Sequence, residues 1–365
     1  MGDELQELRR DFHKIYYEQV AAILLQCEDL RKEQLWSTLL VAGLFGILAL
    51  ACAGYSGYLF HIQTFNDNLS MSMIGAVICC GVVIYVLISN NKSFSRKLKK
   101  RCMRKILSTF ENMQWQDENN NLISTNELIT SDLFSNFTHC KTYDGFSGNY
   151  KGVHYRISEL YLYFLAGSRK RKIYYPVFKG VAMNFSANKL IKNKTIVTSK
   201  GDLHIKGRQW FILIGIIYFL PLFVLGFDTP MLPWILAICT GVLLLIFLCT
   251  KRNQEKLEEI QLEDPVFSKK YRVYSSDEVE SRYLVTPAFM ERFNNVKTAF
   301  GARKIKCSFY NKDIMFAIST NKNLFELGDL FHSLKNPKKI MRFFDEITSI
   351  LMLVDYFKLD EHTKI

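Results

Sequence analysis

The stretch LWSTLLVAGLFGILALACAGYSGYLF, residues 35–60, decides the fold of this chain of 365 residues. It contains no Asp, Glu, Lys, Arg or His, and a helix of about 20 apolar residues is long enough to cross the hydrocarbon core of a bilayer. Three further charge-free stretches, residues 71–89, 210–227 and 231–249, have comparable lengths. Four such stretches are better explained by membrane spans than by buried core helices. We therefore predict four transmembrane helices, arranged as two hairpins.

The flanks of these stretches predict their orientation. Lys and Arg stand just before residue 35 and after residue 89, and again before residue 210 and after residue 249. The short connections, residues 61–70 and 228–230, contain neither Lys nor Arg. Because positive charge accumulates on the cytoplasmic side, both termini and both long polar segments are expected in the cytoplasm. A charged leader of residues 1–33 is not a secretory signal pattern, so we expect the first span to be retained.

Small residues in the first span suggest how the first hairpin packs. Gly43, Gly46, Gly54 and Gly57 would let another helix approach closely, and we expect this face to lie against the second span.

A dense cluster of basic residues follows the second apolar stretch in this chain of net charge +12. Apolar residues recur there at three- and four-residue spacing, which predicts an amphipathic helix over residues 91–118. A plain positive-inside signal would explain the same charges. Basic residues that crowd at membrane exits argue against a nucleic-acid partner. The residues expected to contact anionic lipid headgroups are Arg96, Lys97, Lys99, Lys100, Arg101, Arg104 and Lys105.

The remaining patterns predict the domain order. An apolar stripe from Leu5 to Leu30 predicts an amphipathic cytoplasmic helix, which docks on the protein's own domain or, as an alternative, forms a coiled coil with a second copy. The expected parts are the helix 1–34, the transmembrane hairpin 35–90, the basic helix 91–118, the first part of a cytoplasmic α+β domain 119–208, the second transmembrane hairpin 209–250, and the second part of that domain 251–365.

The soluble pieces complement each other, because residues 126–206 favour strands and residues 275–359 favour helices. We therefore predict one α+β domain with a mainly antiparallel sheet. In its second part, residues 265–274 should be extended, and Ser275 with Glu278 should form a capping box. Alternating apolar residues from Ile305 to Ile318 predict a β-hairpin with its turn at residues 311–313. Thr286 and Asn336, each followed by Pro, should open two helices.

Catalytic and cofactor motifs are missing from the sequence. It contains no phosphate-binding glycine loop, no H-E-x-x-H and no G-x-S-x-G, and its cysteines form no C-x-x-C pair. We expect no enzymatic activity, no cofactor and no metal site. The acidic cluster Asp277, Glu278 and Glu280, with Arg282, is instead a candidate interaction surface, although helix N-termini attract carboxylates anyway.

The run FSKKYRVYSSDEVESRYLVTPAFME, residues 267–291, resembles the bacterial membrane-protein family of domain of unknown function 3137. SFYNKDIMFAI from Ser308, LFEL from Leu324 and GNYKGVHYRISE from Gly148 carry the same resemblance. It implies a multi-pass protein of the bacterial inner (cytoplasmic) membrane, and it implies no catalytic residues.

Two classes of function fit these observations. The first is a membrane-anchored interaction or scaffolding module whose cytoplasmic domain binds an unknown protein partner or the inner leaflet. The alternative is a subunit of an oligomeric transporter or channel, or a lipid-interacting membrane factor, with a homo-oligomer needed to build a pore. Ionisable residues inside a membrane cost about 2.5–3.5 kcal/mol and are kept where function needs them. The apolar stretches contain none, which favours the first class.

Overall fold

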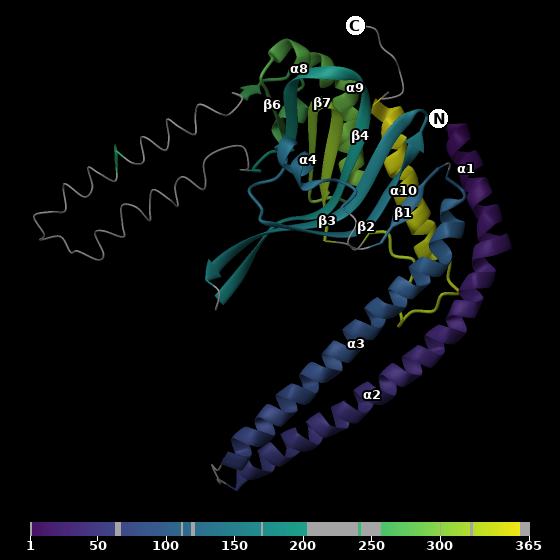
Figure 1. Ribbon diagram of the computed structural model, residues 1–365, viewed down its shortest axis with the longest axis vertical. Coiled ribbons are helices and arrows are strands. Elements are labelled where there is room, and N and C mark those ends of the chain that lie inside the picture. The colour runs from purple at the N-terminus through teal and green to yellow at the C-terminus, as the bar shows by residue number, and fades with distance from the viewer. Residues whose placement is uncertain are drawn as a thin grey trace, which may run out of the picture. The chain divides into compact units, whose positions relative to one another are not determined.

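A computed structural model describes residues 2–62, 67–110, 112–117, 121–168, 171–202, 240–241, 257–299, 301–321 and 324–357 (Figure 1). These residues belong to two compact units. The helical unit contains residues 1–115 and 323–350, and the sheet unit contains residues 116–322 and 351–365. The predicted spans 210–227 and 231–249, and so the second hairpin 209–250, lie outside the described residues apart from Thr240 and Gly241.

The helical unit is built on two long helices. α1 (Gly2–Ile15), a π-helical segment (Tyr16–Val20) and α2 (Ala21–His61) follow one another without a break, because the residues that flank the π-helical segment keep right-handed helical dihedrals. α3 (Asp67–Leu107) runs back along α2 (Figure 1). The amphipathic helix and the first predicted span are thus one helix. The basic helix likewise continues the second span, and it ends at Leu107 instead of residue 118.

Aromatic packing holds the N-terminal stripe inside the helical unit. Phe12 is fully buried and stacks on Phe344, with ring centroids 4.2 Å apart. Phe110 also stacks on Phe344, with ring centroids 5.6 Å apart. Residues 323–350, which include most of α10 (Lys338–Phe357), therefore group with the helices. From the sequence they were expected in the second part of the α+β domain, residues 251–365.

The sheet unit contains a seven-stranded sheet with the order β1-β2-β3-β4-β6-β5, and β7 pairs β4 as well. The strands are β1 (Gln114–Gln116), β2 (His139–Tyr150), β3 (Val153–Ser168), β4 (Arg171–Ser199), β5 (Glu258–Ile260), β6 (Tyr271–Ser275) and β7 (Lys304–Ser319). Every pairing from β2 to β7 is antiparallel, which confirms the expected sheet type. β4 comes from the first soluble piece, and its neighbours β6 and β7 come from the second.

The predicted hairpin over residues 305–318 is wrong. β7 is one strand that runs unbroken along β4, from Thr198 opposite Lys306 to Gly180 opposite Ser319. The register shifts near Ile191 opposite Asn311, where Asn311 has a φ of 54°. A long strand and a hairpin share the same period of two, and here the polar residues mark a β-bulge instead of a turn.

Caps explain a second difference from the sequence analysis. Residues expected to be extended form α7 (Pro265–Lys270), because Asp264 Oδ1 accepts from Val266 N at 2.7 Å and from Phe267 N at 3.2 Å. Pro265 then occupies the first turn, where its missing N–H costs nothing. Only Tyr271–Ser275 is a strand.

Of the other three predicted helix starts, one is wrong and two are confirmed. α8 (Glu278–Leu284) is capped by Asp277, and not by Ser275, whose hydroxyl lies 2.9 Å from Thr195 Oγ1 within the sheet. α9 (Pro287–Ala299) opens at Thr286, whose Oγ1 accepts from Phe289 N at 3.2 Å. Asn336 Oδ1 accepts from Lys338 N at 3.0 Å at the start of α10, so these two predictions are confirmed.

Both faces of the central strands are covered. Phe293 of α9 lies 5.1 Å from Tyr271 and 6.4 Å from Phe316, measured between ring centroids, and Phe289 lies 5.5 Å from Phe309. The opposite face packs against α4 (Thr125–Thr130) and the residues after it. The fully or nearly buried residues of that cluster are Ile123, Leu128, Leu133, Leu160, Leu162, Phe178, Ala182, Ile196, Tyr310, Met315 and Ala317.

Candidate functional site

The apolar residues of α2 and α3 are exposed where a soluble protein would bury them. Both helices are long and apolar enough to cross a membrane, yet only 17% of the most apolar window of the first, and 6% of that of the second, is buried. Leu44 is 72% exposed, Ile47 is 71% exposed, and Val77 on α3 is 71% exposed. In the described part of the chain, two apolar helices could therefore span a membrane.

Polar side chains of the same helices point toward each other. Ser56 Oγ lies 2.6 Å from Ser72 Oγ across the pair, and Asn90 Nδ2 donates to Thr38 Oγ1 at 2.9 Å. Thr38 Oγ1 in turn donates to the carbonyl of Gln34 at 2.6 Å. The hairpin is thus apolar outside and hydrogen-bonded inside, the arrangement that a lipid environment requires.

The first span packs against the second as expected, but the prediction that the glycines of α2 form the packing face is wrong. A Cβ added at Gly43, Gly46, Gly54 or Gly57 would meet no atom within 4 Å. Gly75 of α3 is the glycine that approaches the partner helix, since a Cβ there would lie 3.6 Å from Cys52 Sγ. The hydrogen-bonding residues, and not the glycines, therefore select the facing sides.

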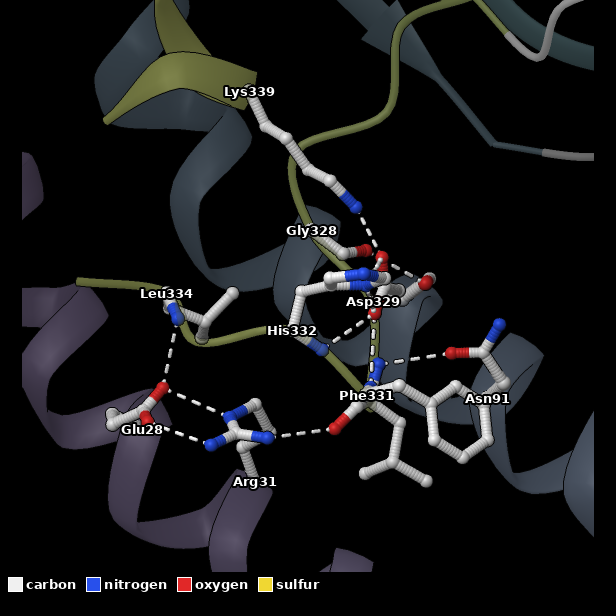
Figure 2. A network of polar contacts seen from close by, with 11 residues as sticks. Glu28, Arg31, Asn91, Gly328, Asp329, Phe331, His332, Leu334 and Lys339 are labelled. Atoms are coloured by element: carbon white, nitrogen blue, oxygen red, sulfur yellow. Dashed lines mark hydrogen bonds and ion pairs between the residues drawn. The ribbon is translucent and has the colours of Figure 1, made fainter. Parts of the chain in front are cut away.

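A buried ion pair stands on α2 just before the first candidate span (Figure 2). Arg31 Nη2 and Nε donate to the two carboxylate oxygens of Glu28 at 2.8 Å and 2.9 Å. Both side chains are at most 8% exposed. Glu28 Oε2 also accepts from Leu334 N at 2.9 Å, and Arg31 Nη1 donates to the carbonyl of Leu330 at 2.8 Å. The pair therefore ties residues 324–337, here called the 324–337 segment, to α2.

Electrostatics keep this ion pair charged. The hydrogen bonds from Arg31, helped by Leu334 N, lower the pKa of Glu28 to about 2. The same contact raises the pKa of Arg31. Charge-assisted and bidentate hydrogen bonds of this kind are among the strongest in proteins.

α3 fastens the 324–337 segment from the other side. Asn91 Oδ1 accepts from Leu330 N at 2.9 Å, and Ser95 Oγ donates to the carbonyl of Gly328 at 2.8 Å. Asp329 accepts from His332 N at 2.9 Å and pairs with Lys339 at the start of α10 (Figure 2). Burial alone would raise the pKa of Asp329, but the contacts with Lys339 and His332 outweigh it and lower the pKa to about 2.

A groove of about 450 Å³ opens between α2 and α3 on the polar side of the candidate spans. Glu33 on α2 and Lys97 and Arg101 on α3 are its charged lining residues. All three are exposed, and among the residues that the structure describes none forms an ion pair between a carboxylate and a Lys or Arg side chain. The remaining lining residues are Cys27, Leu30, Gln34, Ser37, Phe94 and Leu98.

Cys27, one of the lining residues, contacts a second thiol on α3. Cys27 of α2 and Cys102 of α3 are both buried. The hydrogen bond from Cys102 lowers the pKa of Cys27 to about 6 against the effect of burial, and Arg101 lowers it further. The contacts with Cys102 and Arg101 therefore both favour the ionised form of Cys27.

The predicted lipid-contact residues lie on one helix and mostly face outward. Lys99 is half-buried, and the others on the list, Arg96, Lys97, Lys100, Arg101, Arg104 and Lys105, are exposed. Phe94, Leu98 and Cys102 between them are buried, which gives α3 the expected amphipathic character beyond the span. Contact with lipid headgroups stays a prediction.

The residues of the acidic cluster in the sheet unit form hydrogen bonds that stabilise the fold. Asp277 Oδ1 accepts from Val279 N and Glu280 N at 2.8 Å and 3.1 Å, and so caps α8. The Glu280 carboxylate accepts from Lys192 N and Asn193 N of β4 at 3.1 Å and 2.8 Å.

The remaining members of the cluster pair with each other, since Glu278 accepts from Arg282 at 2.8 Å. What α8 exposes besides these charges is apolar, because Val279 is 66% exposed and Tyr283 is 64% exposed. These two residues, which the sequence analysis missed, are the better candidates for a contact surface.

The Glu28 and Arg31 pair was also missed, although a signal was present. Glu28 follows the buried Leu24 by four residues, and Arg31 follows the buried Cys27 by four. Charged residues at the spacing of a buried stripe are expected to be buried and paired.

Comparison with known families gives one match. The sequence model of a family described as protein of unknown function, DUF3137, matches residues 176–359, just over half of the chain. No curated protein and no solved structure matches.

Proposed function

This chain belongs to the DUF3137 family of proteins of unknown function, and from that starting point we propose that it is a membrane-anchored interaction module. In this proposal the hairpin of α2 and α3 crosses the bilayer, and the 324–337 segment lies at its basic end. The second predicted hairpin, residues 209–250, anchors the chain a second time.

One observation carries the proposal: the hairpin is apolar outside and polar inside. Exposing a Leu or Ile side chain to water instead of burying it costs about 1.5–3 kcal/mol. Leu44, Ile47 and Leu50 are among many such side chains, each more than two-thirds exposed. Exposing this surface to water would therefore cost much free energy, whereas contact with the apolar lipid tails would not. The Ser56 to Ser72 and Asn90 to Thr38 contacts meet the complementary need that polar groups be paired within the membrane.

Orientation follows from charge. The exposed cations of α3 from Arg96 to Lys105 lie beyond one end of the span, so this end is proposed to be cytoplasmic. The cytoplasmic side of the bacterial inner membrane, with both termini inside, is the corresponding location.

The proposed partner is a protein that contacts α8 of the sheet unit. Val279 and Tyr283 are exposed apolar side chains, and the charged residues Glu278 and Arg282 stand beside them on the same helix. An aromatic and an aliphatic residue ringed by charges is a common composition for a protein contact.

The experiment uses the full chain in bacterial membranes. Extraction at alkaline pH should leave the protein in the membrane pellet, a reporter fused after Asn68 should be outside, and one fused after Asn120 should be inside. Release by alkaline extraction, or an outside report at Asn120, would contradict the proposal.

The partner is tested separately, with a photo-crosslinking residue at position 283 in the same membranes. It should give a discrete product that is lost when Val279→Asp is added. The matched control is a crosslinker at Ile129, which is 57% exposed on α4. A product of equal yield at both positions would refute a specific surface on α8.

A further inference from the structure

The groove between α2 and α3 lies where the polar part of a lipid would be if the hairpin spans the bilayer. Gln34 immediately precedes the first charge-free stretch, residues 35–60, and Ser37 lies at its start. On α3, Lys97 follows Ser89, the last residue of the second charge-free stretch, by eight positions. At 1.5 Å per residue, this is about 12 Å along the axis. The headgroup region adds about 5–8 Å on each side of the hydrocarbon core. A Lys side chain bends back over such a distance readily.

The charges of the groove are arranged as a complement to a zwitterion. Lys97 and Arg101 are four residues apart and so share one side of α3, while Glu33 lines the groove from α2. Because no ion pair joins these charges to a carboxylate, a Lys or an Arg in the described chain, a ligand can supply the opposite charge. Two cations suit a phosphodiester, and a carboxylate suits an ammonium that donates N–H groups.

The rest of the lining fits the remainder of a lipid. Leu30, Phe94 and Leu98 line the groove and offer apolar surface for the start of the acyl chains. Its volume of about 450 Å³ is within the range of small-ligand sites. Cys27 also lines the groove and hydrogen-bonds with Arg101, so Lys97 is the main phosphate contact and Arg101 the second.

We propose that this groove binds the headgroup of an amino-phospholipid, with the phosphodiester at Lys97 and Arg101 and the ethanolamine ammonium at Glu33. This inference rests on the proposed function, because a spanning hairpin brings lipid to the groove. It is separate from the diffuse attraction between the basic face of α3 and anionic headgroups. A glycerol headgroup leaves Glu33 facing negative charge, and a choline headgroup has no N–H to donate.

Native mass spectrometry of the full chain in detergent micelles tests the proposal. The protein is titrated with phosphatidylethanolamine, phosphatidylglycerol and phosphatidylcholine of identical acyl chains. The ethanolamine lipid should bind about tenfold more tightly than the other two, the effect of about one charge-assisted hydrogen bond. Equal affinity for all three lipids would overturn the assignment.

Variants separate the two halves of the site. Glu33→Gln should lower the affinity for phosphatidylethanolamine about tenfold and remove the preference for it over phosphatidylglycerol. Lys97→Gln combined with Arg101→Gln should lower the affinity for all three lipids. The controls are Glu18→Gln for the first change and Lys269→Gln with Lys312→Gln for the second, which alter the same charge at exposed positions away from the groove. An unchanged lipid preference in Glu33→Gln, or a control that behaves like its test variant, would refute the site.

A soluble headgroup distinguishes the source of the phosphate. Glycerophosphoethanolamine should compete with the lipid only at much higher concentration, because it lacks the acyl chains that lie on α2 and α3. Competition at equal concentration would overturn the lipid assignment in favour of a soluble phosphodiester. The titration in micelles measures lipid binding to the groove whether or not the hairpin spans a bilayer. A lack of lipid preference would therefore refute the groove alone, whereas release of the protein by alkaline extraction would refute the proposed function.

Discussion

Replacing Glu28 with Gln should loosen the 324–337 segment from α2. Glu28 is only 3% exposed. Its carboxylate accepts two hydrogen bonds from Arg31, one from Ser333 Oγ and one from Leu334 N. Gln keeps the size of the side chain and one acceptor oxygen, but it removes the charge. Arg31, which is only 7% exposed, is then left without its counterion.

The expected magnitude follows from the pKa. Folding lowers the pKa of Glu28 from 4.5 to about 2. A pKa unit corresponds to about 1.4 kcal/mol, so the ionised carboxylate stabilises the closed segment by about 3 kcal/mol at pH 7. Removing one partner of a buried pair costs about 3–5 kcal/mol, which agrees with this value.

The pH dependence has a defined sign. Because the pKa of Glu28 is lower in the folded state, its stabilisation is complete above about pH 5 and is lost as the pH falls from 4.5 toward 2. Asp329 contributes in a similar range, since its pKa also falls, from 3.8 to about 2. The difference between wild type and Glu28→Gln isolates Glu28, and that difference should shrink as the pH falls.

Hydrogen exchange of the full chain measures this opening. Peptides that contain Leu330 and Leu334 should exchange with an opening free energy about 3 kcal/mol lower in Glu28→Gln at pH 7, and peptides of β7 should not change. Glu18→Gln, an exposed carboxylate of the π-helical segment, is the control. A change below about 1 kcal/mol at Leu334, or one that does not shrink at low pH, would refute the role of the ion pair.

Three further outcomes are expected. Ile47→Lys places a charge in the middle of the first span, where it should make membrane insertion about 3–4 kcal/mol less favourable. The control Gly43→Leu, at a position with open space, should not reduce insertion in the same glycosylation-mapping or reporter assay. Equal insertion of the two variants would argue against a lipid-facing α2. Lys97, Lys99, Lys100 and Arg101 of α3 are replaced together by Gln. Binding to anionic vesicles, measured by co-sedimentation, should weaken by about 1 kcal/mol for each charge removed. Unchanged binding would indicate that these cations only set the orientation. Residues 116–202 joined to residues 257–322 by a short Gly/Ser linker should unfold in one cooperative transition, because β4 pairs with β6 and β7, and two separate transitions would contradict a shared core.

Local signals in the sequence predicted much of the architecture. The charge-free stretches before His61 and after Ser70 gave the two described long helices, and Thr286 and Asn336 placed the starts of α9 and α10 because caps act over three or four residues. Asp264 followed by Pro265 carries a signal of the same kind, yet residues 265–274 were predicted to be extended.

Non-local contacts could not be predicted in this way. The period of two along residues 305–318 fits a hairpin and a single strand equally, and only pairing with β4 decides between them. Leu330 and Leu334 meet Glu28 and Arg31 from about 300 positions away, so no window of sequence contains both sides of the network. The groove depends on the same long-range meeting of α2 with α3.

Paramagnetic accessibility at Leu44 is the most direct test of the central claim that the hairpin of α2 and α3 lies in lipid. A nitroxide amino acid replaces this residue, which is 72% exposed, in the full chain reconstituted in liposomes. Our account predicts high accessibility to oxygen, which concentrates in the hydrocarbon core, and low accessibility to a water-soluble nickel chelate. The same label at Lys105, on the exposed basic face of α3, should show the reverse order. Equal or greater access of the nickel chelate at position 44 would contradict a spanning hairpin.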